Sequence, residues 1–397
     1  MLTNKNVVIG VTGSIAAYKI ANLASMLVKQ HANVDVIMTE NATNFINPIA
    51  FETLTSNKCI VDTFDRNFQF NVEHVSLAKK ADIFLVAPAS ANVIGKMAAG
   101  IADDMLTTTL LAAKCPIYVA PAMNTNMYTN IIVQDNIAKL KRYGVHFITP
   151  ATGRLACDDV GIGKLASEDV LMDNILREIA MPHDLEGLKV VVTAGPTREK
   201  IDPVRYLSNN STGKMGYAIA KVAMMRGANV TLISGPTSLD KPRFVDAIDV
   251  VSARDMYEAV VEEAKDADVV IKAAAVADYR PDTVADEKIK KKDGDMSISL
   301  ERTDDILASL GANKSDKLFL CGFSMETENL IENSRKKLDK KNLDMIVCNN
   351  LKVAGAGFGT DTNVVTFITK SDIKELPIMS KEEVASKLLD EILTLRK

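Results

Sequence analysis

The sequence contains few of the residues that mark metal centres, disulfide frameworks or nucleic-acid binding. Its five cysteines are scattered, odd in number and never spaced as CxxC, which weighs against a zinc site and fits a reducing cytoplasm. Its four histidines never form HExxH, so a metallohydrolase is not expected. The net charge of −4 argues against a general binder of nucleic acid or membrane surfaces. No cleavable apolar segment follows the N-terminus, so we expect no signal peptide.

Charge is also missing from the 20 residues between Cys115 and Gln134. A stretch of this length could span a bilayer, but Pro116, Pro121 and three asparagines would be costly in lipid. We therefore predict no membrane segment here. The stretch is better interpreted as a buried strand over 117–120 that runs into a polar ligand loop.

Short apolar runs alternate with helical patterns along the chain. In the first half, the runs of strand length are 6–12, 32–39, 82–88, 116–121 and 145–150. In the second half, they are 188–195, 228–235, 267–275, 317–324, 343–350 and 363–369. This alternation predicts an α/β fold with parallel sheets covered on both faces.

The two halves also resemble each other in places. ANVDVIMTE is similar to ANVTLISGP, and ADIFLVAP is similar to ADVVIKAA. Because 397 residues exceed one typical core, we expect two Rossmann-like three-layer domains, residues 1–182 and 183–397.

In parallel sheets, ligands bind beyond the carboxyl ends of the strands. GSIAAYK at 13–19 follows the first predicted strand and opens a helix, which favours an anion such as phosphate. It lacks GxGxxG, and its lysine has no Walker A context, so a mononucleotide fits better than a dinucleotide. An ordinary strand–helix turn capped by Ser14 is an equally good interpretation of this motif alone.

Further polar residues follow the later strands of the first half. PASAN at 88–92 and PAMN at 121–124 each place an Asn where it could bind a heterocycle or a carboxylate, although turns also use Pro and Asn. His74 is the best acid–base candidate if these loops converge on it. Cys157, in a Gly-flanked polar loop, is a candidate proton donor.

The second half repeats this arrangement. TAGPTRE at 193–199 ends a strand, and SNNSTGKMG at 208–216 opens a helix at a predicted anion site. EKIKKK at 287–292 could be a solvated charge run, but lysines that follow a strand end could also contact a polyphosphate.

Together these segments resemble one family over essentially the whole chain, the bacterial bifunctional phosphopantothenoylcysteine decarboxylase/phosphopantothenate–cysteine ligases of coenzyme A biosynthesis. The motifs that carry the resemblance, in the family's order, are GSIAAYK, EHVSLAKKAD, PASAN, PAMNTNMY, TAGPTREKIDPVRYLSNNSTGKMG, AAAVADYR, EKIKKK and KKNLD.

The resemblance implies a flavodoxin-like FMN domain at the N-terminus. His74 matches the family's catalytic histidine, Asn124 matches the residue that binds the substrate carboxylate, and Cys157 matches the proton donor. In that mechanism FMN oxidises the cysteinyl thiol to a thioaldehyde, CO2 leaves, and reduction with protonation gives 4′-phosphopantetheine without net redox change. The positions that match FMN-binding residues are Gly13, Ser14, Thr39, Ser90, Asn92 and Ala122.

The resemblance also implies a ligase domain at the C-terminus. There CTP and Mg2+ convert the carboxylate of 4′-phosphopantothenate into an acyl-cytidylate, and the amine of L-cysteine then displaces CMP. Asn209 matches a residue that contacts the acyl-cytidylate, and Lys288 matches one that serves its conversion. The positions that match nucleotide-binding residues are Lys272, Ala273, Ala274, Asp278, Lys288, Asp304, Asp305, Ile306, Leu307, Phe323, Lys337 and Lys341. No residue is assigned to Mg2+.

The sequence departs from the family pattern at two places. Asp158 stands where the family usually has Gly, and its charge would keep the thiol of Cys157 protonated. The family often has Asn-Pro-Asp-Ile where residues 303–306 are TDDI, so the proline is missing.

Two alternatives remain open from the sequence. One is a flavin oxidoreductase fused to a nucleotide-binding domain, and the other is a non-enzymatic FMN-binding regulator. A regulator would not need His74, Asn124 and Cys157 together. The family also implies homo-oligomers with trimeric flavin domains and paired ligase domains, which can gather into dodecamers.

Overall fold

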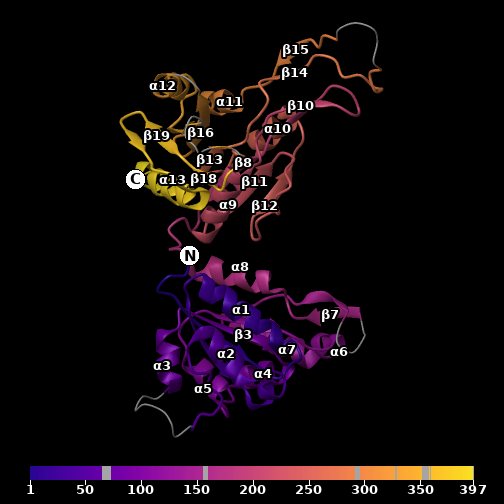
Figure 1. The fold of residues 1–397 in the computed structure, drawn as a ribbon, viewed down its shortest axis with the longest axis vertical. Helices are drawn as coiled ribbons and strands as arrows, with labels where there is room; N and C mark the ends of the chain where they lie inside the picture. The colour runs from indigo at the N-terminus through magenta and orange to yellow at the C-terminus, as the bar shows by residue number, and fades with distance from the viewer. Residues whose placement is uncertain are drawn as a thin grey trace. The chain divides into compact units, whose positions relative to one another are not determined.

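The computed structural model describes residues 1–64, 73–154, 160–290, 296–326, 329–350, 357 and 359–396. The chain divides into two compact units, Met1–Met181 and Pro182–Lys397, each described here by itself (Figure 1). Within the described ranges, no helix has both the length and the apolar character that a bilayer span requires.

The first unit is built on a five-stranded parallel sheet in the order β2-β1-β3-β4-β5. Its strands are β1 (Asn6–Val11), β2 (Asn33–Met38), β3 (Ile83–Ala89), β4 (Ile117–Pro121) and β5 (His146–Phe147). A separate antiparallel hairpin consists of β6 (Ala151–Arg154) and β7 (Val160–Lys164). The helices are α1 (Ala17–Lys29), η1 (Glu40–Asn44), α2 (Pro48–Thr55), α3 (Glu73–Lys80), α4 (Ala91–Ala99), α5 (Met105–Ala112), α6 (Thr125–Thr129), α7 (Ile131–Arg142) and α8 (Glu168–Ile179).

The second unit contains an eight-stranded sheet in the order β12-β11-β8-β13-β16-β17-β19-β20. Its strands are β8 (Lys189–Ala194), β11 (Asn229–Ser234), β12 (Asp246–Asp249), β13 (Val269–Lys272), β16 (Phe319–Glu326), β17 (Met345–Asn350), β19 (Val365–Thr369) and β20 (Ile373–Glu375). The short pairs are β9 (Arg198–Lys200) with β10 (Tyr206–Ser208), β14 (Tyr279–Pro281) with β15 (Leu300–Arg302), and β18 (Thr362–Asn363) with β21 (Met379–Ser380). The helices are α9 (Lys214–Met225), α10 (Ala253–Glu263), α11 (Ile306–Ala312), α12 (Leu330–Lys340) and α13 (Lys381–Leu395).

The parallel parts of the two sheets have related strand orders. Counted along the chain, the first sheet has the order second, first, third, fourth, fifth, and the larger sheet has the order third, second, first, fourth, fifth, sixth, because β12 adds a parallel strand outside β11. In both units an aspartate just before β3 or β13, the strand that pairs with the other side of the first strand, accepts a hydrogen bond from the first residue of that first strand. Asp82 Oδ2 accepts from the N–H of Asn6 at 2.6 Å, and Asp268 Oδ2 accepts from the N–H of Lys189 at 2.9 Å. The expected likeness of the two halves therefore extends to topology and to a matching hydrogen bond.

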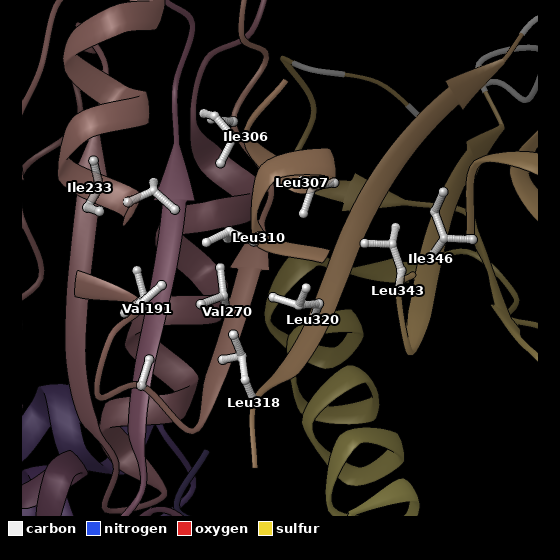
Figure 2. Packing of buried hydrophobic residues seen from close by; sticks show 14 of the residues in the cluster. Val191, Ile233, Val270, Ile306, Leu307, Leu310, Leu318, Leu320, Leu343 and Ile346 are labelled. Carbon is white, nitrogen blue, oxygen red and sulfur yellow. The ribbon is translucent and has the colours of Figure 1, made fainter. Parts of the chain in front are cut away.

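The cores lie where the central strands are buried on both faces. Val190, Val191 and Val192 are all fully buried in β8, as expected for a strand covered on both sides. On one face of this sheet, side chains of α10, α11 and α12 join the strands in one apolar cluster, part of which is shown in Figure 2. Helix α9 packs against β8, β11 and α13.

The eight-stranded sheet is not parallel throughout. Strand β19 pairs antiparallel with β17, and β20 pairs antiparallel with β19. The apolar run at 363–369 predicts this strand but not its direction. Helix α13 and the three short strand pairs of this unit have no counterpart among the elements predicted from the sequence.

One close helix–strand contact makes a prediction about stability. A Cβ on Gly216 in α9 would lie 2.6 Å from Ala194 Cβ and 2.8 Å from Thr193 O. We expect Gly216→Ala to lower the free energy of unfolding by about 1–3 kcal/mol, because α9 must move away from β8. Gly95→Ala in α4 is the control, since the nearest atom to its new Cβ is 3.9 Å away. Urea unfolding monitored by circular dichroism should show Gly95→Ala neutral or stabilised by up to about 1 kcal/mol; equal effects of the two changes would contradict the packing argument.

Candidate functional site

Four neighbouring strands of the first sheet end in the loops that carry the predicted flavin residues. After β1, β2, β3 and β4, respectively, come Gly13 and Ser14, then Thr39, then Ser90 and Asn92, then Ala122 and Asn124. Because these strands are parallel and adjacent, all four loops leave the sheet at the same edge. The structure therefore brings this predicted set together.

Hydrogen bonds between the loops fix this edge. The Thr12 hydroxyl donates to Pro88 O at 2.7 Å and accepts from the N–H of Ser90 at 2.9 Å, which joins the ends of β1 and β3. The N–H of Thr39 donates to Val11 O at 3.0 Å, which joins the ends of β2 and β1. Ser90 also caps α4 through its hydroxyl. The loops are thus held in place by the chain itself.

Two features of this edge fit a bound polar group. A Cβ on Gly13 would lie 2.9 Å from Asn41 Cβ, so glycine is what allows the loops after β1 and β2 to approach so closely. Thr39 Oγ1 is buried and has no hydrogen-bond partner among the described residues. A buried hydroxyl without a partner costs free energy, and a ligand atom at this edge would supply the missing bond.

Asn124 begins α6 beside the β6–β7 hairpin. Its Oδ1 accepts from the N–H of Asn126 at 2.8 Å, and this bond orients the carboxamide. The N–H of Met123 donates to Gly163 O at 3.0 Å, which attaches β7 to the loop after β4. The hairpin that flanks Cys157 in the sequence therefore contacts the chain next to Asn124.

The other two predicted catalytic residues of this unit are not brought to the edge by any described contact. Cys157, like the neighbouring Asp158, falls between β6 and β7, outside the described residues. His74 is half-buried in the first turn of α3, and no hydrogen bond between described residues ties its side chain to the four loops.

In the second unit, a cavity of about 570 Å3 lies at the carboxyl ends of β13 and β17, beside the start of α9. The predicted residues that line it are Asn209, Lys272, Ala273, Ala274, Asp278, Leu307, Phe323, Lys337 and Lys341. A neighbouring cavity of about 360 Å3 shares Lys272, Asp278 and Lys341. The predicted residues added there are Asp304, Asp305 and Ile306. Lys288 is exposed and lines neither cavity.

The loop after β13 forms one wall of the larger cavity, and its backbone N–H groups bond to the protein. The donor–acceptor pairs are Ala274 N with Thr193 Oγ1 (3.1 Å), Ala275 N with Gly195 O (2.9 Å) and Ala277 N with Thr197 Oγ1 (3.0 Å). The carboxamide of Asn209 donates to Ala275 O at 3.1 Å and to Val276 O at 3.3 Å. These bonds hold Asn209 against the cavity wall.

The cavity is electropositive around Lys272. Desolvation, and next the charge of Lys341, together lower the pKa of Lys272 to about 8, and Asp305 and Asp278 oppose the shift. Lys341 is paired with Asp305 at 2.8 Å. An anionic ligand would stabilise the charged form of the half-buried Lys272 and so raise its pKa again.

The structure adds two lysines that sequence reasoning did not assign. Lys214 at the start of α9 and Lys381 at the start of α13 both line the larger cavity. The ammonium of Lys214 donates to Gly359 O at 2.9 Å, and that of Lys381, a side chain only 5% exposed, donates to Gly357 O at 3.1 Å. Lys214 could have been found within SNNSTGKMG. Lys381 could not, because the β18–β21 pair brings it from the far end of the chain.

The two units match two family models. The model described as "Flavoprotein" matches residues 1–180. The model described as "DNA/pantothenate metabolism flavoprotein C-terminal domain" matches residues 185–395. The chain is therefore a flavoprotein with two α/β domains.

Named relatives specify the family. The chain is 51% identical over 403 residues to the coenzyme A biosynthesis bifunctional protein CoaBC of Bacillus subtilis, covering 100% of this chain and 98% of the relative. The CoaBC protein of Vibrio vulnificus is 43% identical over 396 residues, covering 99% and 98%. A crystal structure of a CoaBC C-terminal domain is 51% identical, covers 53% of this chain and 98% of that one, and aligns with a TM-score of 0.46.

The chain belongs to the family of bifunctional coenzyme A biosynthesis proteins, the bacterial decarboxylase/ligases that its motifs resemble. It is an enzyme with a decarboxylase and a phosphopantothenate–cysteine ligase activity.

The buried hydroxyl of Thr39, which has no partner among the described residues, leads to a prediction about flavin binding. We expect Thr39→Val to weaken binding of flavin mononucleotide by about three- to tenfold, because one hydrogen bond is lost. The thermal stability of the flavin-free protein should stay the same or rise, since no protein bond is removed. Flavin fluorescence titration and thermal unfolding measure the two quantities.

Thr12→Val is the matched contrast for this test. Its hydroxyl is bonded at both ends of the β1–β3 connection, so its loss should lower the stability of the flavin-free protein. The interpretation of Thr39 would be contradicted if Thr39→Val destabilised the flavin-free protein as Thr12→Val does, or bound the flavin as the wild type does.

Proposed function

We propose that residues 1–182 form an FMN-dependent 4′-phosphopantothenoylcysteine decarboxylase and residues 183–397 a CTP- and Mg2+-dependent ligase. The observation that carries the proposal is the larger cavity, where nine residues matched to the family's ligase line one space at the carboxyl ends of the strands. The alternative of a flavin oxidoreductase fused to an unrelated nucleotide-binding domain is not favoured, because the second family model covers residues 185–395.

In the decarboxylase domain, the loops after β1 to β4 would hold FMN, which supplies two-electron redox chemistry to the substrate thiol. The hydroxyl of Thr39 would bond to the cofactor, and Gly13 allows the loops after β1 and β2 to approach each other there. Asn124, with its Oδ1 held by Asn126, would donate from Nδ2 to the substrate carboxylate. The net reaction replaces the carboxylate by hydrogen and releases CO2, so one proton must be supplied. We propose that Cys157 delivers it and that His74 serves as the acid–base group.

In the ligase domain, the lysines of the cavity would neutralise the triphosphate. Lys272, Lys337 and Lys341 line the cavity together and face a ligand whose negative charge grows as pyrophosphate leaves. The carboxylate of 4′-phosphopantothenate would attack the α-phosphorus of CTP. The amine of L-cysteine would then attack the acyl carbon, with CMP as the leaving group. Asn209, fixed by two backbone carbonyls, would contact the acyl-cytidylate, and Lys288 would assist its conversion.

Within the described part of the chain, no three His, Cys, Asp or Glu side chains gather into a metal-binding group. We propose that Mg2+ is carried mainly by the phosphates of CTP and by water, with Asp278 as the predicted carboxylate that lines the larger cavity.

We also propose a cytoplasmic homo-oligomer. Cys59, Cys115 and Cys321 are free thiols, in keeping with a reducing compartment. Large apolar side chains remain exposed on the first unit, among them Tyr18 at 61% and Ile131 at 74%, which fits trimeric contacts of the flavin domain.

The direct test is reconstitution of both steps. We expect the purified protein to bind FMN and to convert 4′-phosphopantothenate, L-cysteine and CTP, with Mg2+, into 4′-phosphopantetheine, CO2, CMP and pyrophosphate. ATP in place of CTP should give a slower reaction. Product analysis by mass spectrometry with each nucleotide checks both points. Failure of the FMN-loaded protein to form 4′-phosphopantetheine, or equal rates with ATP and CTP, would contradict the corresponding part of the proposal.

The lowered pKa of Lys272 predicts a pH dependence of nucleotide binding. Bound triphosphate raises the pKa of Lys272, so binding takes up a proton once the pH exceeds the value of about 8 in the free protein. The affinity for CTP should therefore be level below pH 8 and fall by up to tenfold per pH unit above it. Calorimetric titration between about pH 7 and about pH 9.5 measures this. Lys272→Arg keeps its charge throughout and should remove the decline; an equal decline in both proteins would exclude Lys272 as its source.

A further inference from the structure

Asp202 is a buried carboxylate that lines neither the larger cavity of the second unit nor the neighbouring one. It lies between β9 and β10, in the turn of a short hairpin, and is only 1% exposed. A buried carboxylate is stable only when its oxygens are well supplied with hydrogen-bond donors. The donors of Asp202 come from two distant parts of the chain.

Oδ1 of Asp202 serves the turn itself, because it accepts from the N–H groups of Val204 and Arg205, both at 2.8 Å. Oδ2 of Asp202 instead binds the Arg205 side chain and a distant part of the chain. It accepts from Nε of Arg205 at 2.9 Å and from the N–H of Ile289 at 3.1 Å, 87 positions further along the chain. The Arg205 side chain is the main cause that holds the pKa of Asp202 below its usual range.

The segment that contains Lys288 is therefore held at Ile289, the residue that follows Lys288. Arg205 also donates from Nη2 to Ile289 O at 2.8 Å, so Asp202 and Arg205 together bind both sides of the Ile289 backbone. The N–H of Ala285 adds a bond to Ile201 O at 3.0 Å. Lys288 itself stays exposed between these two anchored positions.

The same hairpin also carries Asn209. Strand β10 ends at Ser208, whose hydroxyl donates to Thr197 O at 2.7 Å, and Asn209 follows with its carboxamide on the cavity wall. The four residue-to-residue steps from Arg205 to Asn209 span at most about 13 Å when extended. One small element thus fixes Asn209 at one end and the backbone beside Lys288 at the other.

We propose that Asp202 is a positioning residue for the ligase reaction, which holds Lys288 in place relative to Asn209 through its bond to the N–H of Ile289. The inference rests on the proposed role of Lys288. The competing interpretation is that Asp202 merely stabilises the hairpin turn.

Asp202→Asn separates the two interpretations. Asparagine keeps an oxygen for the N–H groups of the turn but places an NH2 group where Oδ2 receives Arg205 and Ile289. We expect kcat for ligation to fall at least about tenfold while KM for CTP changes less than about threefold, because charge-assisted bonds are lost without loss of the cavity. Decarboxylation of supplied 4′-phosphopantothenoylcysteine should be unchanged.

Glu199→Gln is the matched control. Glu199 is 3% exposed, lies in β9 of the same hairpin, and accepts from the N–H of Ala253 at 2.8 Å rather than from the lysine segment. Both variants replace a buried carboxyl group by a carboxamide, so their melting temperatures report the structural cost. If both lose the same kcat together with the same stability, Asp202 has only a structural role and the proposal is overturned.

Coupling to Lys288 is tested by a double-mutant cycle. If Asp202 acts through Lys288, Asp202→Asn should lower kcat little further in a Lys288→Gln background. Fully multiplicative losses would overturn the positioning role while leaving the role of Lys288 intact. Full ligation activity of Lys288→Gln would instead overturn the proposed role of Lys288, and the inference with it.

Ile289→Pro removes the donor of the same hydrogen bond, because proline has no backbone N–H to donate to Asp202. It serves as the second variant if Asp202→Asn does not fold. Loss of kcat with retained KM for CTP supports the proposal, and wild-type kcat contradicts it.

Discussion

The constraint on which both domains depend is the shared register of parallel strands, because it decides which loops meet. In each unit an aspartate just ahead of β3 or β13 accepts the first N–H of the neighbouring first strand, Asp82 from Asn6 and Asp268 from Lys189. With the amino ends aligned in this way, the carboxyl ends fall at one edge, and the segments that follow the strands are brought together. The flavin loops of one domain and the lysine-lined cavity of the other are both consequences of this alignment.

Much of this arrangement could be predicted from the sequence, because buried parallel strands appear as plain apolar runs. The likeness of ANVDVIMTE to ANVTLISGP marks the second strand of each parallel series, and the structure pairs this strand with the first strand in both units. The apolar pattern does not predict the direction of a strand or the pairing of very short strands. The β9–β10 hairpin has strands of three residues, too short for any periodicity, and β19 reverses direction without a change in its apolar character.

The residues of the candidate sites likewise include some that local sequence patterns predict and some that they do not. Residues directly after strands were predictable as a group, and the structure gathers them. Lys381 was not predictable, because a pairing of two-residue strands, too short for any periodic pattern, brings it to the cavity. Lys288 shows the opposite case: its motif was recognised, but its place depends on Asp202, a residue that no local pattern connects to it. Contacts over 87 positions are set by tertiary structure alone.

The hydrogen bonds of the loop after β13 have a consequence for how phosphate is bound. Three of its N–H groups are already used by Thr193, Gly195 and Thr197, so this loop is a wall and not the open backbone cradle of a P-loop. Phosphate oxygens in this cavity would then be bound by the start of α9 and by ammonium groups on long, adjustable side chains, not by this loop. Such binding would tolerate a change in the shape of the phosphate chain as pyrophosphate departs. It would also make nucleotide binding by the ligase domain sensitive to ionic strength, since mobile ions compete for the same lysines.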